Sequence, residues 1–314
     1  MKTAMKNRLG RYALMVAAAA FIVPVTPGAE SWTRRAGAAT AKTITLGIVS
    51  KRPQAQVEAE FRDFIRYVAR KFSTPSSAVE GKVAAAPTVW QLAKLLEEDR
   101  VDFYMDSPYP TYLINRQGAA IPLLRRWKGG AAEYRGLVFA RKDTDSLRLE
   151  DLRGKVIAFE DPGSTSGYFL PKIFLVTKGL KLAEKTSLDA TVAPAEVGYI
   201  FTYSAGKIAE MVLSRKVAAG AFSNDDYNRL DAKKKAETVI LGETENFPRH
   251  FVSIRKTLDP AAANRLQETL VMMHQDPEGR TILQKLDNTT KFDFAPGGEM
   301  AVRLKLQEVF GPQP

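Results

Sequence analysis

Short apolar segments alternate with amphipathic segments along the chain after residue 42. ITLGIV at 44–49, KVAAAP at 82–87 and VDFYMD at 101–106 are short and bounded by polar residues, which predicts buried strands. Between them, residues 55–72 place apolar side chains at helical spacing, and residues 88–98 begin with a threonine, a residue that favours helix N-caps. This alternation predicts an α/β fold with largely parallel sheets.

The same alternation continues to the end of the chain. Further strands are predicted at 134–142, 156–161, 217–223, 239–244 and 250–256, and further helices at 167–179, 260–276, 278–286 and 298–309. At about 100–200 residues per domain, a chain of 314 residues predicts two lobes or domains. Because no long linker separates them, we expect the chain to cross between the lobes more than once.

Residues 1–41 have the order of regions found in secretory signal peptides. A polar, basic start precedes the apolar run at 12–25, and small residues follow at 36–41. The apolar run is shorter than the roughly 20 residues that span a bilayer. We predict a signal peptide over residues 1–41, cleaved after Ala41 or alternatively after Ala29, and hence a periplasmic location. An uncleaved N-terminal anchor is the other interpretation.

Charge and composition exclude several classes of protein. Six of the 46 basic residues but one of the 35 acidic residues lie in residues 1–41, so a net charge of +6 remains for the rest of the chain. That surplus suits a small anionic ligand, and without dense basic runs or interleaved aromatic residues we expect no nucleic-acid binding. The absence of cysteine excludes disulfides, thiolate metal sites and cysteine nucleophiles. The two histidines, His250 and His274, lack metal-ligand spacing, so we expect neither a metal nor a cofactor.

The stretch that carries the most chemistry is VIAFEDPGSTSGYFLP at 156–171. A strand runs into a loop of glycine and small hydroxyl residues, and a helix is predicted to begin at about Ser166 or Gly167. Backbone N–H groups at the start of a helix, beside three hydroxyls, can hold an oxyanion. An ordinary serine N-cap is the alternative. The loop lacks the Gly-Lys-Ser/Thr of a Walker loop, and Thr165 occupies the position of the serine in a nucleophile elbow.

This stretch also carries a family resemblance. The run at 133–171 resembles the phosphate, phosphite and phosphonate branch of the periplasmic substrate-binding proteins of ABC transporters. In that branch a Tyr-Arg-containing strand, a Leu-x-Asp-Leu-x-Gly-Lys turn and an Asp-Pro-x-Ser-Thr-Ser-Gly-Tyr loop occur in this order. Residues 46–72, 101–113 and 218–230 are similar to further family segments.

The resemblance implies a two-lobed α/β fold of the type II periplasmic binding proteins. Each lobe is expected to be a mostly parallel sheet flanked by helices, with a ligand cleft between the lobes. Residues 42–136 and 245–314 would form lobe 1, and residues 137–244 would form lobe 2. Closure of the lobes about a hinge would bury the ligand.

The resemblance also implies the residues that hold the ligand. They are Ser164, Thr165 and Ser166 in the oxyanion loop, Ser107 and Tyr109 from lobe 1, and Asp225, Asp226 and Tyr227 from lobe 2. An acid beside an anion site can accept a hydrogen bond from a protonated ligand oxygen and repel an ion that lacks the proton.

One departure from the family pattern widens the range of ligands. The family often carries a histidine in a Gly-Ser-His-Asp-like context, and TYSAGKIAEM at 202–211 has none. Tyr203, Ser204 or Lys207 is expected to substitute for it. Phosphate, phosphite, a sulfonate or another small molecule therefore stay open beside a phosphonate.

Other residues are weaker candidates. Lys51 and Arg52 follow the first strand, at the end where open α/β sheets bind ligands, and are candidate anion contacts or a solvated surface pair. Tyr134 and Arg135 are expected to be structural. His250 is expected at the hinge or on the surface.

The leading interpretation is a non-catalytic carrier, which captures a small anion in the periplasm and delivers it, as a monomer, to an ABC permease in the inner membrane. A ligand-sensing subunit of a membrane signalling system with the same fold is the alternative. An enzyme that uses Ser164 or Ser166 ranks third, because no base lies near these serines in the sequence.

Overall fold

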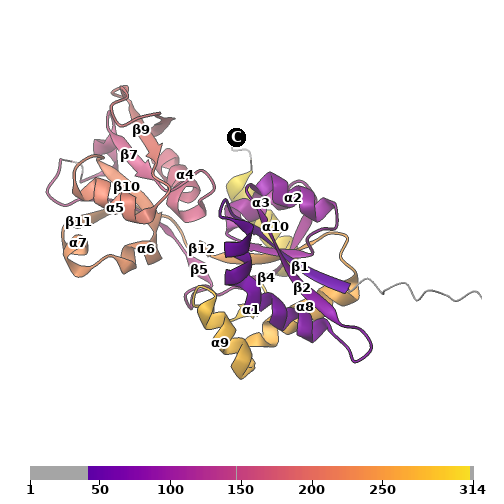
Figure 1. Cartoon of the computed structure of the whole chain (residues 1–314). Coiled ribbons are helices and arrows are strands. Elements are labelled where there is room, and N and C mark those ends of the chain that lie inside the picture. The colour runs from indigo at the N-terminus through magenta and orange to yellow at the C-terminus, as the bar shows by residue number, and fades with distance from the viewer. Residues whose placement is uncertain (1–41, 146, 312–314) are drawn as a thin grey trace, which may run out of the picture. The chain divides into compact units, whose positions relative to one another are not determined.

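Residues 42–145 and 147–311 are described by a computed structural model (Figure 1). The predicted signal peptide at 1–41 lies outside the described residues. The described chain belongs to one compact unit with two six-stranded sheets and a short two-stranded sheet. Helices flank both large sheets, which confirms the predicted α/β class. In the described ranges, none of the helices has the length and apolar content needed to cross a bilayer.

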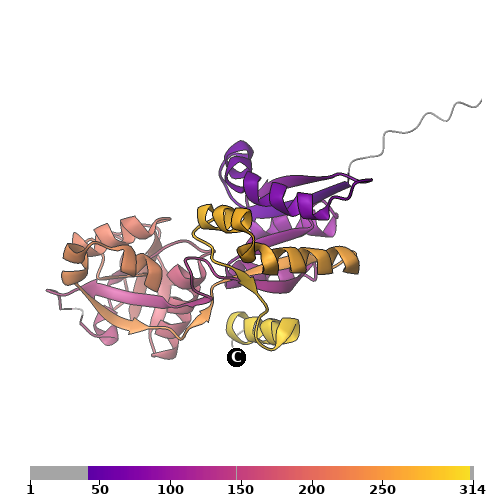
Figure 2. The same cartoon turned by 90° about the horizontal axis from the view of Figure 1, so that it is seen from below.

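The first sheet combines strands from both ends of the chain in the order β14-β4-β13-β3-β1-β2. Its strands are β1 (Lys42–Val49), β2 (Val79–Ala86), β3 (Phe103–Asp106), β4 (Ala120–Arg126), β13 (His250–Arg255) and β14 (Phe292–Asp293). Its helices are α1 (Gln54–Phe72), α2 (Val89–Glu97), α3 (Pro108–Asn115), α8 (Pro260–Met272), α9 (Pro277–Lys285) and α10 (Gly298–Phe310), with a 3₁₀ turn at Met273–Gln275. Figure 2 shows gold helices from late in the chain beside the indigo N-terminal segments.

Burial of apolar helix faces holds this lobe together. Helix α1 buries Phe61, Phe64 and Val68 on one face, as the helical spacing predicts, while charged residues cover the opposite face. These side chains join strands β1 and β3 and helix α8 in one apolar core. The core fixes the carboxyl end of β3, where Asp106 and Ser107 lie.

The second sheet is built from the middle of the chain in the order β11-β6-β10-β7-β9-β8. Its strands are β6 (Gly136–Arg141), β7 (Val156–Phe159), β8 (Lys181–Glu184), β9 (Glu196–Phe201), β10 (Ala219–Ser223) and β11 (Thr238–Glu243). Its helical segments are a 3₁₀ turn at Leu149–Leu152, a π turn at Thr165–Phe169, α4 (Leu170–Thr177), α5 (Ala205–Leu213), α6 (Asn224–Arg229) and α7 (Ala232–Ala236).

Both large sheets are mixed: the expectation of mostly parallel pairing holds in the second sheet but not in the first, where antiparallel pairs predominate. In the first sheet β1 pairs in parallel with β2 and β3, whereas β13 is antiparallel to β3 and β4. In the second sheet β7, β9 and β10 are joined in parallel, whereas β6 is antiparallel to β10 and β11. Strand β14, antiparallel to β4, is also reversed. Two of the reversed strands, β6 and β13, are those that enter each lobe from the crossing. They start where the parallel strands end, and must therefore run the opposite way.

Two short strands carry the crossing between the sheets. Strand β5 (Glu133–Tyr134) leads out of the first sheet, and β12 (Phe247–Pro248) leads back to it. They pair antiparallel, with Phe247 opposite Tyr134. The predicted strand at 134–142 is thus divided into a crossing part, β5, and a lobe part, β6.

Strand β4 was missing from the expected elements. Its sequence, AIPLLRR, contains Pro122, which cannot donate to a ladder and argues against a central strand. In the structure Pro122 lies opposite Ser253, where the register with β13 shifts between Val252 and Ser253. The irregularity accommodates the missing N–H group.

Candidate functional site

A cavity of about 480 Å³ lies where the chain crosses between the two sheets. The first sheet contributes Asp106 and Ser107 after β3, and Arg249 and His250 at the start of β13. The second sheet contributes the loop after β7 and the end of β10. The lining residues are Val49, Val89, Asp106, Ser107, Pro110, Lys128, Tyr134, Glu160, Asp161, Gly163, Ser164, Thr165, Ser166, Ser223, Asp226, Arg229, Arg249 and His250. Polar groups from both lobes therefore converge on one space.

The loop after β7 is held in shape by Ser164. Its hydroxyl donates to Glu160 Oε2 at 2.8 Å and accepts from the Gly167 N–H at 3.0 Å, so it acts as an N-cap. The following turn is a π turn, closed by Phe169 N–H donating to Ser164 O at 3.0 Å, and not the first turn of the predicted α-helix. Such turns are rare, and they occur frequently at functional sites.

Thr165 connects the two lobes. Its Oγ1 accepts from the Tyr109 N–H at 2.9 Å and donates to Ser107 Oγ at 3.1 Å. The side chain is buried, and its partners lie more than 50 positions away in the sequence. The threonine of the predicted oxyanion loop thus meets the two lobe 1 residues that were matched to the same site.

Tyr134 on the crossing strand β5 extends this group of hydroxyls. Burial raises the pKa of Tyr134, while hydrogen bonds with the hydroxyls of Thr165 and Ser166 lower it. Sequence analysis placed Tyr134 in a structural role; in the structure it is buried and lines the cavity. The site therefore includes a residue of the crossing itself.

Carboxylates also line the cavity, and each has a protein donor. Asp106 Oδ1 accepts from the Ser107 N–H at 2.7 Å, Asp161 Oδ1 from the Gly163 N–H at 2.8 Å, and Asp226 Oδ2 from the Ser223 hydroxyl at 2.5 Å. Burial, the largest cause, raises the pKa of Asp106 to about 6, although the Ser107 hydrogen bonds lower it. Burial likewise raises the pKa of Glu160 against the effect of the Ser164 hydroxyl.

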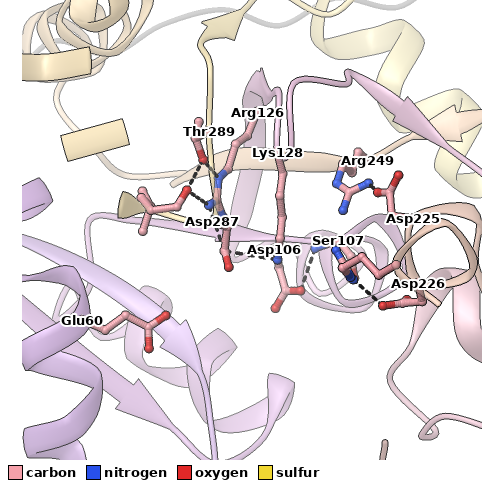
Figure 3. A network of polar contacts seen from close by, with 12 residues as sticks. Glu60, Asp106, Ser107, Arg126, Lys128, Asp225, Asp226, Arg249, Asp287 and Thr289 are labelled. Atoms are coloured by element: carbon pink, nitrogen blue, oxygen red, sulfur yellow. Dashed lines mark hydrogen bonds and ion pairs between the residues drawn. The ribbon is translucent and has the colours of Figure 1, made fainter. Parts of the chain in front are cut away.

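Basic side chains also lie at and beside the cavity (Figure 3). Lys128 reaches Asp287 Oδ2 at 3.2 Å, and the same oxygen accepts from Arg126 Nη2 at 3.0 Å. Arg249 pairs with Asp225, and Arg229 pairs with Asp226. Desolvation lowers the pKa of Lys128, although Asp287 raises it. Asp287 therefore holds two cations beside the cavity.

Three residues that the resemblance matched to the ligand site do not line the cavity: Asp225, Tyr227 and Tyr109. Asp225 reaches the cavity indirectly, through its ion pair with Arg249. The Tyr227 ring packs against Phe139 in the second core, and its hydroxyl lies 3.0 Å from Thr238 Oγ1. The Tyr109 ring stacks on Phe169 with centroids 4.2 Å apart, so its backbone N–H, and not its ring, contacts the loop.

The candidates from other segments are also not among the lining residues. Lys51 and Arg52 are exposed, and Arg52 pairs with Glu60 at 2.6 Å. Tyr203 is 69% exposed. Ser204 caps α5 by accepting from the Lys207 N–H at 3.4 Å. None of these side chains lines the cavity in the described chain, and their predicted contact with a ligand stays a prediction.

Sequence reasoning missed Asp106, Glu160, Lys128 and Arg249. Asp106 ends strand β3 and Glu160 directly follows β7, so the rule that ligands bind at carboxyl ends of strands points to them. Lys128 precedes the crossing strand β5 and Arg249 follows the crossing strand β12, and for such segments the sequence has no comparable signal. His250, expected at the hinge or on the surface, lines the cavity.

The fold and the cavity define a two-lobed periplasmic binding protein. A family model described as "ABC transporter, phosphonate, periplasmic substrate-binding protein" matches residues 46–295. The chain therefore belongs to the family of phosphonate-type periplasmic substrate-binding proteins of ABC transporters, as the resemblance predicted.

Individual relatives agree with this assignment. The chain is 26% identical over 192 residues to the phosphate-import protein PhnD of Mycolicibacterium smegmatis, a match that spans 58% of each protein. It is 27% identical to XAC2383 from Xanthomonas citri bound to chloride, with a TM-score of 0.77 over 85% of this chain and 98% of that one. A second XAC2383 structure is bound to ATP. PhnD1 from Prochlorococcus marinus, in complex with methylphosphonate, shares the fold at 14% identity, with a TM-score of 0.62 over 85% and 97% of the two chains.

Asp106→Asn is expected to stabilise the unliganded protein by about 3 kcal/mol near pH 8, since each unit of pKa shift corresponds to about 1.4 kcal/mol. The pKa of the Asp106 carboxyl is about 3.9 in the unfolded chain, and burial raises it to about 6 in the folded protein. The cost of ionising it in the folded state is therefore present above about pH 6 and absent below about pH 4. Asparagine keeps an acceptor for the Ser107 N–H.

Urea unfolding near pH 8 and near pH 4 measures this effect. The gain should vanish at the lower pH, and the exposed control Asp189→Asn should show no gain at either pH. An equal gain at both pH values would contradict a buried, ionised Asp106.

Proposed function

We propose that this chain is the solute-binding component of an ABC importer, and that it binds a small oxyanion of the phosphonate, phosphite or phosphate class. The observation that carries the proposal is that Thr165 lines the cavity while its hydroxyl contacts Tyr109 and Ser107 of the other lobe. A carrier needs a site that both lobes complete, because the ligand must be enclosed on closure and released on opening.

The chemistry of the lining supports an oxyanion. Hydroxyls of Ser107 and Ser166 and the ammonium of Lys128 are donors on the cavity wall. Donors of this kind match phosphonyl and phosphoryl oxygens. The carboxylate of Asp106 can accept from an oxygen that still carries a proton.

The proposed function also includes two lobes joined by hinge strands and a permease as partner. We assign residues 42–136 and 245–314 to one lobe and residues 137–244 to the other, with β5 and β12 as the hinge strands. The protein acts as a monomer in the periplasm, after removal of a signal peptide, and delivers its ligand to an inner-membrane permease.

Titration calorimetry on residues 42–314 tests the proposal against phosphate, phosphite, methylphosphonate, sulfate, taurine and ATP. ATP is included because XAC2383 is described bound to it. We expect saturable binding of at least one phosphorus oxyanion and no product on prolonged incubation. Folded protein that binds none of the phosphorus compounds would overturn the proposal, and hydrolysis of a phosphate ester would favour an enzyme.

A further inference from the structure

Arg249 is a buried cation on the cavity wall whose hydrogen bonding is incomplete. The residue is 6% exposed, and its guanidinium lies over the Tyr134 ring at 5.3 Å from the centroid. It pairs with Asp225, but its Nε has no hydrogen-bond partner in the described part of the chain. A buried donor without an acceptor destabilises the folded protein, so we expect the Arg249 Nε–H to have an acceptor.

His250, the next residue, also has a buried nitrogen without a hydrogen-bond partner in the described chain. This nitrogen is Nδ1, and the side chain lines the same cavity. Burial, followed by the charges of Lys128, Arg126 and Arg249, lowers the pKa of His250 well below its ordinary value. The imidazole is therefore neutral and can donate one N–H to an acceptor.

Both cations and carboxylates surround Arg249 and His250. Asp287 is shared by Lys128 and Arg126, so one carboxylate faces two cations. The lining carboxylates Asp106, Glu160, Asp161 and Asp226 each accept a hydrogen bond from the protein. The Arg249 Nε–H can only donate, so its missing partner is an acceptor.

The cavity is also larger than a bare tetrahedral oxyanion requires. Its volume of about 480 Å³ lies in the roughly 300–1,000 Å³ range of pockets that enclose larger organic ligands. An oxyanion at the Ser164–Ser166 loop leaves room for a second polar group.

Building on the proposed function, we propose that the cavity binds phosphorus oxyanions that carry a second acidic group. The Ser164–Ser166 loop holds the phosphonyl or phosphoryl end, and Arg249 and His250 hold a carboxylate or second phosphoryl group. A guanidinium suits this role, because its planar fork matches the two oxygens of a carboxylate.

Calorimetry with matched phosphonates tests this inference above the pH range in which Asp106 titrates. Phosphonoacetate and 3-phosphonopropionate carry the second acid, propylphosphonate carries an apolar end, and 2-aminoethylphosphonate carries an ammonium. We expect at least one of the diacids to bind about tenfold or more tightly than the other two, as a charge-assisted hydrogen bond predicts.

Two variants separate binding from a structural role. Arg249→Gln should remove the preference for the diacid while changing propylphosphonate affinity less than about threefold. Asp225→Asn frees the guanidinium from its protein partner, and should keep or increase the preference. Arg215→Gln, an exposed arginine paired with Asp143, makes the same charge change elsewhere and should alter neither affinity.

The outcomes are distinct. Equal affinity for diacid and propylphosphonate, or tightest binding of the aminophosphonate, overturns the inference but leaves the proposed function standing. If Asp225→Asn loses the preference as Arg249→Gln does, the ion pair acts in lobe closure and the inference is also wrong. Folded protein that binds no phosphorus compound overturns the proposed function itself.

Discussion

Replacing Thr165 and Ser166 together by alanine lowers oxyanion affinity about a hundredfold or more. A charge-assisted hydrogen bond from Ser166 to the ligand is worth about 1.5–3 kcal/mol, and the two Thr165 hydrogen bonds between the lobes are worth about 0.5–1.5 kcal/mol each. The Thr165 hydroxyl joins Tyr109 and Ser107 across the lobes, and the Ser166 hydroxyl lies in the group with Tyr134. The double variant therefore weakens both the ligand contacts and the closed arrangement. Calorimetry with the tightest ligand of the panel measures the change.

The matched control removes two hydroxyls that serve only exposed helix ends. Thr177 and Ser214 donate to the carbonyls of Phe174 and Met211, so Thr177→Ala with Ser214→Ala should leave affinity unchanged. An unaltered dissociation constant in the Thr165 and Ser166 double variant would rule out the loop as the oxyanion site. The single variants Thr165→Ala and Ser166→Ala then show how much of the lost affinity comes from the contact between the lobes and how much from the contact with the ligand.

Gly167→Ala should also reduce binding by about a hundredfold, because a displacement of about 1 Å in a positioned group can cost that much. A Cβ at this position would lie 2.5 Å from Glu160 Oε2 and 2.7 Å from Glu160 Cβ. The loop must shift to relieve the overlap, and Ser164 then loses its bonds to Glu160 and to the Gly167 N–H. Overpacking of this kind also costs about 1–3 kcal/mol of stability.

Gly206→Ala is the matched control. Gly206 also lies in the first turn of a serine-capped helix, but the nearest atom to an added Cβ is Ser204 Oγ at 3.6 Å. This variant should keep both affinity and melting temperature. If Gly167→Ala binds as tightly as the wild type, the packing of Glu160 against the loop does not shape the site.

The loop residues were predictable because local signals define them. A buried strand followed by Gly163 and three hydroxyl residues marks a strand-to-helix turn, and such turns expose backbone N–H groups. Tyr227 shows the limit of this reasoning. Neighbouring positions on a helix point about 100° apart, so Asp226 lines the cavity while Tyr227 packs against Phe139.

Arg249 and Lys128 could not be assigned from local pattern. Arg249 is one position before β13, and its partner Asp225 lies in the other lobe on α6. From the sequence alone, a basic residue beside a short crossing segment is expected on the surface. Only the packing of the crossing against the second lobe buries it. Burial to 6% exposure is a consequence of that placement.

By itself, the sequence determined the α/β class, most of the helices and strands, and the hydroxyl loop at Ser164–Ser166. Periodicity, caps and turn residues act over a few positions, so they can be recognised in the sequence without knowledge of the fold. Only the tertiary structure decided the mixed direction of the sheets and the pairing of Thr165 with Ser107 and of Asp225 with Arg249. These contacts join segments that meet because the chain crosses between lobes, and the geometry of that crossing depends on the packing of both sheets.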